Sequence, residues 1–318
     1  MAIAAAGTTP VRRRRRVHPV VWVLVPLVVV ALVVAGVIVA RSPSSSGRRG
    51  ASSQVVRTSS PAGHHRGHRR SHGRSHAALA ARARDPFTAS LKRWLHHRTG
   101  DITAAVEDLH SRRTWVYRPG HPEHTASIVK VQILATLLHQ EQSEGALSDE
   151  DQDLATGMIE QSSDDDATDL WNAVGGSSAV QAFDDDAGLH HTTTNVAWGL
   201  TTTTPTDQLQ LLRTVLFKNQ LLTRASRAYE YGLMRRIIPF DTWGVTEGPD
   251  HHAKVAFKNG WLPYDGSWQV NSIGSVRGDG RHYLIAVMTD GSPTESYGID
   301  TIERISQNAW HDLDAGGS

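Results

Sequence analysis

A helix that is apolar on nearly every face places the strongest constraint on this fold. Residues 125–142 carry seven apolar side chains whose helical positions surround the axis: Ile128, Val129, Val131, Ile133, Leu134, Leu137 and Leu138. A helix with one apolar stripe can lie on a surface, whereas a helix that is apolar all round must be covered on every side. We therefore expect residues 125–142 to form a helix buried in the middle of a folded domain.

Strand patterns occur on both sides of this helix in the sequence. Two expected strands precede it and three follow it: 102–109, 114–118, 253–258, 268–276 and 281–288. A helix is expected at each end of the region, at 86–100 and 297–311, and the polar stretch 154–222 has a helical pattern. This order favours an α/β (α+β) fold, in which an antiparallel sheet is flanked by helices and carries an all-helical subdomain.

The sequence before this domain contains an expected membrane anchor. Residues 1–18 form a basic cytoplasmic tail, and the transmembrane segment is expected at 19–40, where an apolar stretch of 21 residues begins at Val20. Such a stretch spans about 30 Å as a helix, which is the hydrocarbon thickness of a bilayer. The arginines at 12–16 predict a single-pass protein of the cell membrane with its domain outside the cell. A cleaved signal peptide is the alternative, although its apolar region is usually shorter.

Residues 41–85 are expected to be a disordered linker. They are rich in Ser, Arg, Gly and His and have almost no large apolar side chains, so they cannot bury a core. The histidine-rich run at 64–76 could bind a metal ion or an anionic wall polymer. We favour a positively charged spacer, because scattered histidines in a flexible tract have no preset ligand geometry. The folded domain is therefore assigned to residues 86–318.

The formal net charge of +1 hides an uneven distribution of charge. Residues 1–85 hold 15 of the 33 basic residues and one acidic residue, which leaves 18 basic and 31 acidic residues in the domain. An acidic domain should repel a phosphate backbone, so no nucleic-acid partner is expected. The chain has no cysteine, which excludes a thiolate nucleophile and cysteine-based zinc sites. No metal or organic cofactor is predicted.

Ser127 and Lys130 are the first candidate catalytic residues. Positions i and i+3 share one face of a helix, so the hydroxyl and the amine can meet. A lysine within an apolar helix loses solvation, which lowers its pKa and makes the neutral amine available as a base. Ser127 also lies near the helix N-terminus, where free N–H groups can stabilise an oxyanion. A Ser-x-x-Lys motif alone is common, and the alternative is a surface lysine with a serine at a helix start.

Two further motifs follow in the sequence. The first is Ser163-Asp164-Asp165, in which the serine could relay a proton, although Ser and Asp are also preferred at helix N-termini. The second is Lys258-Asn259-Gly260, after the apolar residues at 255–257 and before Trp261. A lysine there can bind a carboxylate, and a glycine lets a ligand approach the strand backbone. The alternative is a polar strand end followed by a turn.

Taken together, the three motifs resemble the penicillin-recognising serine enzymes, especially class A β-lactamases and their D,D-peptidase relatives. The resemblance covers residues 86–318 and includes the order of strands and helices. It implies that Ser127 is the acylated nucleophile, Lys130 its base and Ser163 the group that passes a proton to the leaving group. Lys258 would hold a substrate carboxylate. The resemblance also implies that Asp165 and Asn259 line the substrate groove, with Gly260 beside them. The backbone N–H groups of Ser127 and Trp261 would form the oxyanion hole.

Three departures from the family pattern bear on the function. Asp165 stands where the family usually has Asn, and Asn259 replaces a Thr or Ser. The segment Thr203-Thr204-Pro205 is recognisable, but residues 189–202 before it contain no Glu or Asp, and the motif Glu-x-x-Leu-Asn is missing. The aspartates at 184–186 are expected in an acidic surface loop. Without a base for the second step, an acyl-enzyme should be hydrolysed slowly.

The sequence thus predicts a membrane-anchored, extracytoplasmic bacterial serine hydrolase. It would act through an acyl-enzyme on an amide, an ester or a β-lactam, with a small molecule or a peptidoglycan-like cell-wall compound as substrate. One alternative is a true class A β-lactamase that confers antibiotic resistance, and another is a non-catalytic sensor of the wall or of β-lactams. The sequence does not indicate an oligomeric state.

Overall fold

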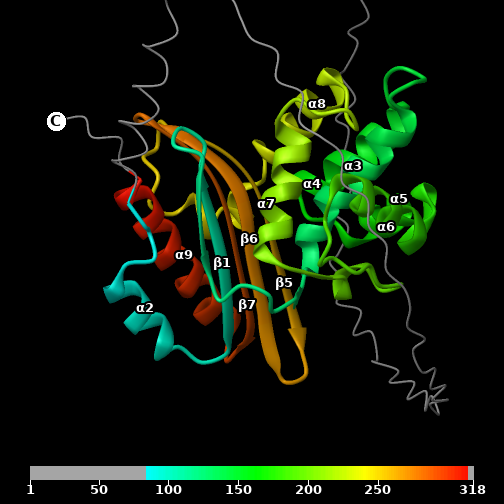
Figure 1. Cartoon of the computed structure of the whole chain (residues 1–318). Helices are drawn as coiled ribbons and strands as arrows, with labels where there is room; N and C mark the ends of the chain where they lie inside the picture. Colours follow the sequence, from blue (N-terminus) through cyan, green and yellow to red (C-terminus); the bar gives the residue numbers. More distant parts are fainter. Residues whose placement is uncertain (1–83, 314–318) are drawn as a thin grey trace, which may run out of the picture. The chain divides into compact units, whose positions relative to one another are not determined.

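Antiparallel strands from both ends of the domain form one sheet, in the order β2-β1-β7-β6-β5 (Figure 1). The computed structural model describes residues 84–313. The strands are β1 (Asp101–Asp108), β2 (Arg113–Tyr117), β5 (Lys254–Tyr264), β6 (Ser267–Gly278) and β7 (Arg281–Ser292). Strand β1 pairs with β7 from Asp101↔Asp290 to Asp108↔Tyr283, which joins the two ends of the domain. The predicted antiparallel sheet with helices is confirmed.

The third motif lies within a strand and not at the end of one. Strand β5 continues past Lys258 to Tyr264 and forms a long hairpin with β6. The turn falls at Asp265 and Gly266, both of which have positive φ angles, 49° and 73°. A strand end followed by a turn was the alternative for this motif, but residues 259 and 260 pair with Ser272 and Asn271 of β6. A glycine is required at position 260 because another segment of the chain packs closely against the strand at this residue.

Each face of the sheet is covered by helices. Helices α2 (Ala89–His96) and α9 (Glu295–Asp312) lie on one side in Figure 1, and α3 to α8 lie on the other. Because alternate strand residues point to opposite faces, β7 contributes Ile285 and Val287 to the core under α9. Its intervening residues Leu284 and Ala286 enter the core shared with the helical part. The alternation places a sheet between two apolar cores.

The helical part is built around α3 (Lys130–Glu141), as predicted for a helix apolar on all sides. Every residue of α3 from Lys130 to Leu138 is buried. The segment begins with a tighter 3₁₀ turn, η1 (Ala126–Val129), and the α-helical pattern starts only at Lys130. The surrounding helices are α4 (Asp149–Glu160), α5 (Asp164–Val174), α6 (Gly176–Ala187), α7 (Pro205–Leu216) and α8 (Arg224–Met234).

Short elements connect the helical part to the sheet. They are β3 (Glu123–His124), β4 (Thr202–Thr203), η2 (Trp198–Leu200), η3 (Pro239–Asp241) and η4 (Gly244–Thr246). Strand β3 pairs with β4, so the segment before η1 lies beside the loop that precedes α7. Thr204 caps α7 by accepting from the Asp207 N–H, and Pro205 follows at the first helical position, where a missing N–H costs nothing.

Within residues 84–313, no helix is long and apolar enough to cross a membrane. The predicted anchor at 19–40 lies outside the described residues, as do the basic tail at 1–18 and all but the last two residues of the predicted linker. Those predictions stay predictions.

Glu230 is a buried acid that opposes folding at neutral pH. Its side chain is fully buried on α8, and among the described residues neither carboxyl oxygen has a hydrogen-bond partner. Burial raises the pKa of this carboxyl well above its usual value of 4.5. The folded protein therefore keeps a proton that the unfolded chain loses, so the free energy of unfolding falls as pH rises from about 4 toward the raised pKa.

We expect Glu230→Met to stabilise the protein at pH 8 by about 2 kcal/mol, or roughly 4–8 °C in Tm, because it removes an unpaired buried polar group. The gain should shrink at pH 5, where the carboxyl is protonated in both states more of the time. Thermal unfolding at both pH values measures the change in Tm, and the exposed Glu144→Gln is the control. An equal change in Tm at pH 5 and pH 8 would contradict the assignment.

Candidate active site

Ser127 lies in a strained turn between the two parts of the domain. Ala126, directly before it, has a φ angle of 46°, a conformation that costs a non-glycine residue about 1–3 kcal/mol. The turn is held from two sides, since the Thr125 N–H donates to the Thr201 carbonyl at 2.8 Å and Asn271 Nδ2 donates to the Thr125 carbonyl at 2.9 Å. The Ser127 side chain is 9% exposed. The strain and the bracing fix the serine at the surface of the helical part.

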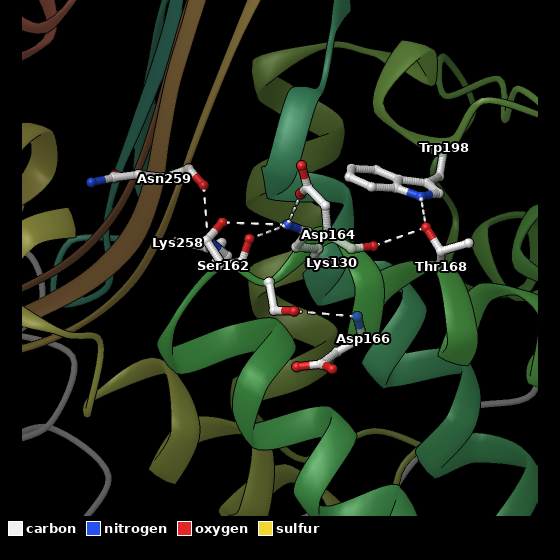
Figure 2. Close-up of polar contacts among 9 residues, drawn as sticks. Lys130, Ser162, Asp164, Asp166, Thr168, Trp198, Lys258 and Asn259 are labelled. Atoms are coloured by element: carbon white, nitrogen blue, oxygen red, sulfur yellow. Dashed lines mark hydrogen bonds and ion pairs between the residues drawn. The ribbon is translucent and has the colours of Figure 1, made fainter. Parts of the chain in front are cut away.

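Lys130 follows one turn later and is fully buried. Its Nζ donates to the Ser162 carbonyl at 2.7 Å and to Asp164 Oδ1 at 2.6 Å (Figure 2). Burial lowers the pKa of this amine, and the Asp164 carboxylate opposes that shift by attraction and by its hydrogen bond, with a smaller attraction from Asp241. The neutral amine is therefore more accessible than that of an exposed lysine.

Ser162 places its hydroxyl between two lysines. Lys258 Nζ donates to Ser162 Oγ at 2.9 Å, and Lys130 Nζ lies 3.4 Å from the same oxygen (Figure 2). Lys258 is also fully buried, and burial, with repulsion from Lys130, lowers its pKa to about 7, while Asp241 and Asp164 oppose the shift. A serine hydroxyl that touches two such amines can exchange protons with either of them.

The structure places Ser162 at the position that the sequence suggested for Ser163. Ser163 instead caps α5, where its Oγ accepts from the Asp166 N–H at 3.2 Å. Likewise Asp164, and not Asp165, contacts Lys130, while Asp165 is exposed in the first turn of α5. The motif is therefore Ser162-Ser163-Asp164, one residue earlier than expected.

The shift has a local cause. Ser162 has a φ angle of 53°, which turns the chain sharply between α4 and α5 so that Ser163 can cap the next helix. Matching the family's Ser-Asp pair literally selected Ser163, although a serine followed by three aspartates is itself a typical helix start. This helix-start pattern is the feature of the sequence that indicates which serine belongs to the motif.

Consecutive residues of the third motif point to opposite faces of strand β5. Gly260 shares its face with Lys258, and a Cβ added to Gly260 would lie 2.7 Å from the backbone nitrogens of Ser127 and Ile128. Only glycine allows β5 to approach the turn at Ser127 this closely. The backbone of Trp261 follows directly, while its ring packs against Trp243 at 5.9 Å between centroids.

Asn259 does not line the groove, in contrast to the expectation from the sequence. Its side chain is fully buried, and Nδ2 donates to the carbonyls of Asp241 at 2.8 Å and Trp243 at 3.1 Å. Its Oδ1 accepts from Ser272 Oγ at 2.6 Å. Asn259 therefore braces the 241–243 segment against the sheet. The reason is the alternation of the strand, which turns Asn259 away from the side that Lys258 faces.

The loop before α7 brings an indole to the site in place of a carboxylate. The Trp198 ring centroid lies 5.0 Å from Lys130 Nζ, and its Nε1 donates to Thr168 Oγ1 at 3.2 Å (Figure 2). The aspartates at 184–186 lie in α6 and not in a surface loop. Asp184 is fully buried, accepts from Gln132 Nε2 at 2.8 Å, and burial raises its pKa to about 8.

No group of three or more His, Cys, Asp or Glu residues within 84–313 could hold a metal ion. The side chains that the structure gathers around Ser162 and the Ser127 turn include two serine hydroxyls and two buried amines.

Solved structures that are similar in fold to this chain include β-lactamases, several of them described as class A. The TLA-3 extended-spectrum β-lactamase is 19% identical, with a TM-score of 0.63 over 70% of this chain and 96% of that one. A class A β-lactamase from Bacteroides cellulosilyticus DSM 14838 is 18% identical, with a TM-score of 0.65 over 73% and 100%. One from Mycobacterium abscessus is 20% identical, with a TM-score of 0.61 over 69% and 96%. At these identities the likeness establishes the fold.

The sequence itself matches a family model described as "Beta-lactamase enzyme family" over residues 148–313, more than half of the chain. The match begins after Ser127 and Lys130 and includes the second and third motifs. No curated protein matches the sequence. By the extent of the family match, and with the fold in agreement, this chain belongs to the β-lactamase enzyme family and is a serine hydrolase.

Proposed function

We propose that this enzyme acylates Ser127 with an amide, ester or β-lactam substrate outside the cytoplasm and then releases the acyl group slowly. The observation that carries the proposal is the buried pair of lysines on either side of Ser162, next to the turn that holds Ser127. The extracytoplasmic location and the peptidoglycan-like substrate rest on the sequence alone.

In the proposed acylation step, the neutral amine of Lys130 takes the proton from Ser127 as Oγ bonds to the substrate carbonyl carbon. The backbone N–H groups of Ser127 and Trp261 would stabilise the oxyanion, which the close packing of β5 on η1 supports. As the bond to the leaving group breaks, Ser162 gives it a proton and regains one from a lysine. Lys258 would bind a carboxylate on the leaving side.

Slow deacylation is supported by what surrounds Lys130. Residues 189–202 contain no carboxylate, and the Trp198 ring lies over the amine where a hydrolytic water would need space. Thr168 holds that ring through its hydrogen bond to the indole. An acyl group on Ser127 is thus shielded from water on this side.

A true class A β-lactamase is the second candidate, and the fold of the solved relatives favours it. A non-catalytic sensor is the third. The burial of Lys130 and the lowered pKa of its amine speak against a pure sensor, because a binding site has no need of a neutral lysine beside a serine.

Incubation of the full-length chain in detergent with a penicillin should add one penicillin mass to the protein within minutes, and the adduct should persist for hours. Intact-protein mass spectrometry measures both, and Ser127→Ala should show no adduct. Consumption of the drug without a trapped adduct would reverse the expectation of slow deacylation. Neither adduct nor consumption would leave the β-lactam proposal without support.

Ser162→Ala should slow adduct formation by about 10²–10⁴-fold, because it removes the proton relay between the lysines. The neighbouring Ser163→Ala is the matched control. It removes the cap of α5, so it should lower stability by about 1 kcal/mol while acylation changes only a few-fold. Adduct-formation rates and urea unfolding separate the two effects. The reverse result, with Ser163 essential, would restore the register expected from the sequence.

Trp198→Ala should shorten the lifetime of the adduct at least about tenfold, because it opens space for water beside Lys130. Thr168→Val, which keeps the indole but removes its hydrogen bond to Thr168 together with the Thr168 bond to the Asp164 carbonyl, should act in the same direction but less. Trp115→Ala, on the strand at the far edge of the sheet, is the control for loss of an indole. Time-resolved mass spectrometry after removal of free drug gives the lifetimes. An unchanged lifetime in Trp198→Ala would exclude shielding by this ring.

A further inference from the structure

Asp164 presents an exposed carboxylate beside the proposed base. Its side chain is 73% exposed, yet Oδ1 lies only 2.6 Å from the fully buried amine of Lys130. Among the described residues, no partner occurs for Oδ2, so one oxygen remains open for a ligand. A carboxylate accepts hydrogen bonds but donates none, so this position favours a substrate group that carries N–H donors.

An aromatic face lies beside that carboxylate. The Lys130 amine lies 5.0 Å from the centroid of the Trp198 ring and 2.6 Å from Asp164 Oδ1, so the ring and the carboxylate both lie beside this amine (Figure 2). The arrangement is fixed by Thr168, whose hydroxyl accepts from the Trp198 indole and donates to the Asp164 backbone carbonyl at 2.8 Å. A carboxylate and an indole face together are the two protein groups that most favour an ammonium ion.

The lysine on the other side of the site is already engaged within the protein. Lys258 is fully buried, its pKa is lowered to about 7, and its amine contacts Ser162 and the Asn259 carbonyl. Asp241 lies close enough to attract both lysines. The open carboxylate of the site is therefore that of Asp164, on the side of Lys130.

We infer that the substrate is an acyl compound that bears an ammonium group close to the scissile carbonyl, and that Asp164 with Trp198 binds this group. The inference rests on the proposed role of Ser127 as the acylated nucleophile. An acyl group on Ser127 lies within one helical turn of Lys130, so a side chain carried on the atom next to its carbonyl can extend toward Asp164. Substrates of this class include esters and amides of short peptides whose free amino group lies one residue before the scissile carbonyl.

Two penicillins that differ only by this group provide the test. Ampicillin carries an α-ammonium on its acyl side chain, and benzylpenicillin has hydrogen there. With the full-length chain at pH 6, ampicillin should acylate Ser127 about five- to tenfold faster than benzylpenicillin, from one partly exposed ion pair and one cation–π contact. The preference should disappear at pH 9, where an α-amino group is neutral.

Asp164→Asn should bring the ratio of the two rates close to one, and Asp165→Asn is the matched control, with the same change of charge one residue further along α5. The ratio is the proper measurement, because loss of Asp164 also alters the pKa of Lys130 and so affects both penicillins equally. Equal rates in the wild type would overturn the inference while leaving the acylation proposal intact. A preference that survives in Asp164→Asn would also overturn it. If neither penicillin forms an adduct and neither is consumed, the proposed acylation of Ser127 fails, and the inference fails with it.

Discussion

The burial of two lysine amines against one serine hydroxyl organises this domain. Lys130 begins α3, Lys258 lies in β5, and Ser162 is between α4 and α5, so three segments far apart in sequence meet at one oxygen. Taking two ammonium groups out of water is costly unless hydrogen bonds and opposite charge replace the lost solvation. The Ser162 and Asn259 carbonyls and the Asp164 carboxylate supply that replacement. The helical part and the sheet are thereby held in one relative position at the site.

Two residues with a strained backbone lie at the same place. Ala126 and Ser162 both adopt positive φ angles without being glycine, and each adjoins or contributes a group of the site. Such conformations persist only where the surrounding structure determines them, which is the role of the bonds to Thr125 and of the cap at Ser163. Gly260 adds the complementary feature, since the absence of a side chain lets β5 reach the Ser127 backbone. The sharp turns and the missing side chain together allow functional groups from separate elements to converge.

Much of this arrangement could be predicted from local patterns. The apolar residues around Lys130 indicated a central helix, and the strand patterns at both ends indicated one sheet. The choice between Ser162 and Ser163 was missed, because adjacent serines differ only in a turn that depends on the packing of α4 and α5. The orientation of Asn259 does not follow from the residues of the motif alone, because it depends on the alternation of side chains along the strand. Trp198 escaped notice because its contact with Lys130 joins segments 68 residues apart.

The brace formed by Asn259 also restricts how this sequence can change. The family's usual residue at this position is Thr or Ser, but a hydroxyl could not reproduce both donations of the amide to the carbonyls of Asp241 and Trp243. A single mutation toward the common form would leave buried backbone oxygens without partners and loosen the segment that carries Asp241. Conversion would therefore require compensating mutations in the 241–246 segment and at Ser272, which bonds to the same amide. The residue type at Asn259 therefore depends on the residues that it bonds, and these positions are expected to change together in evolution.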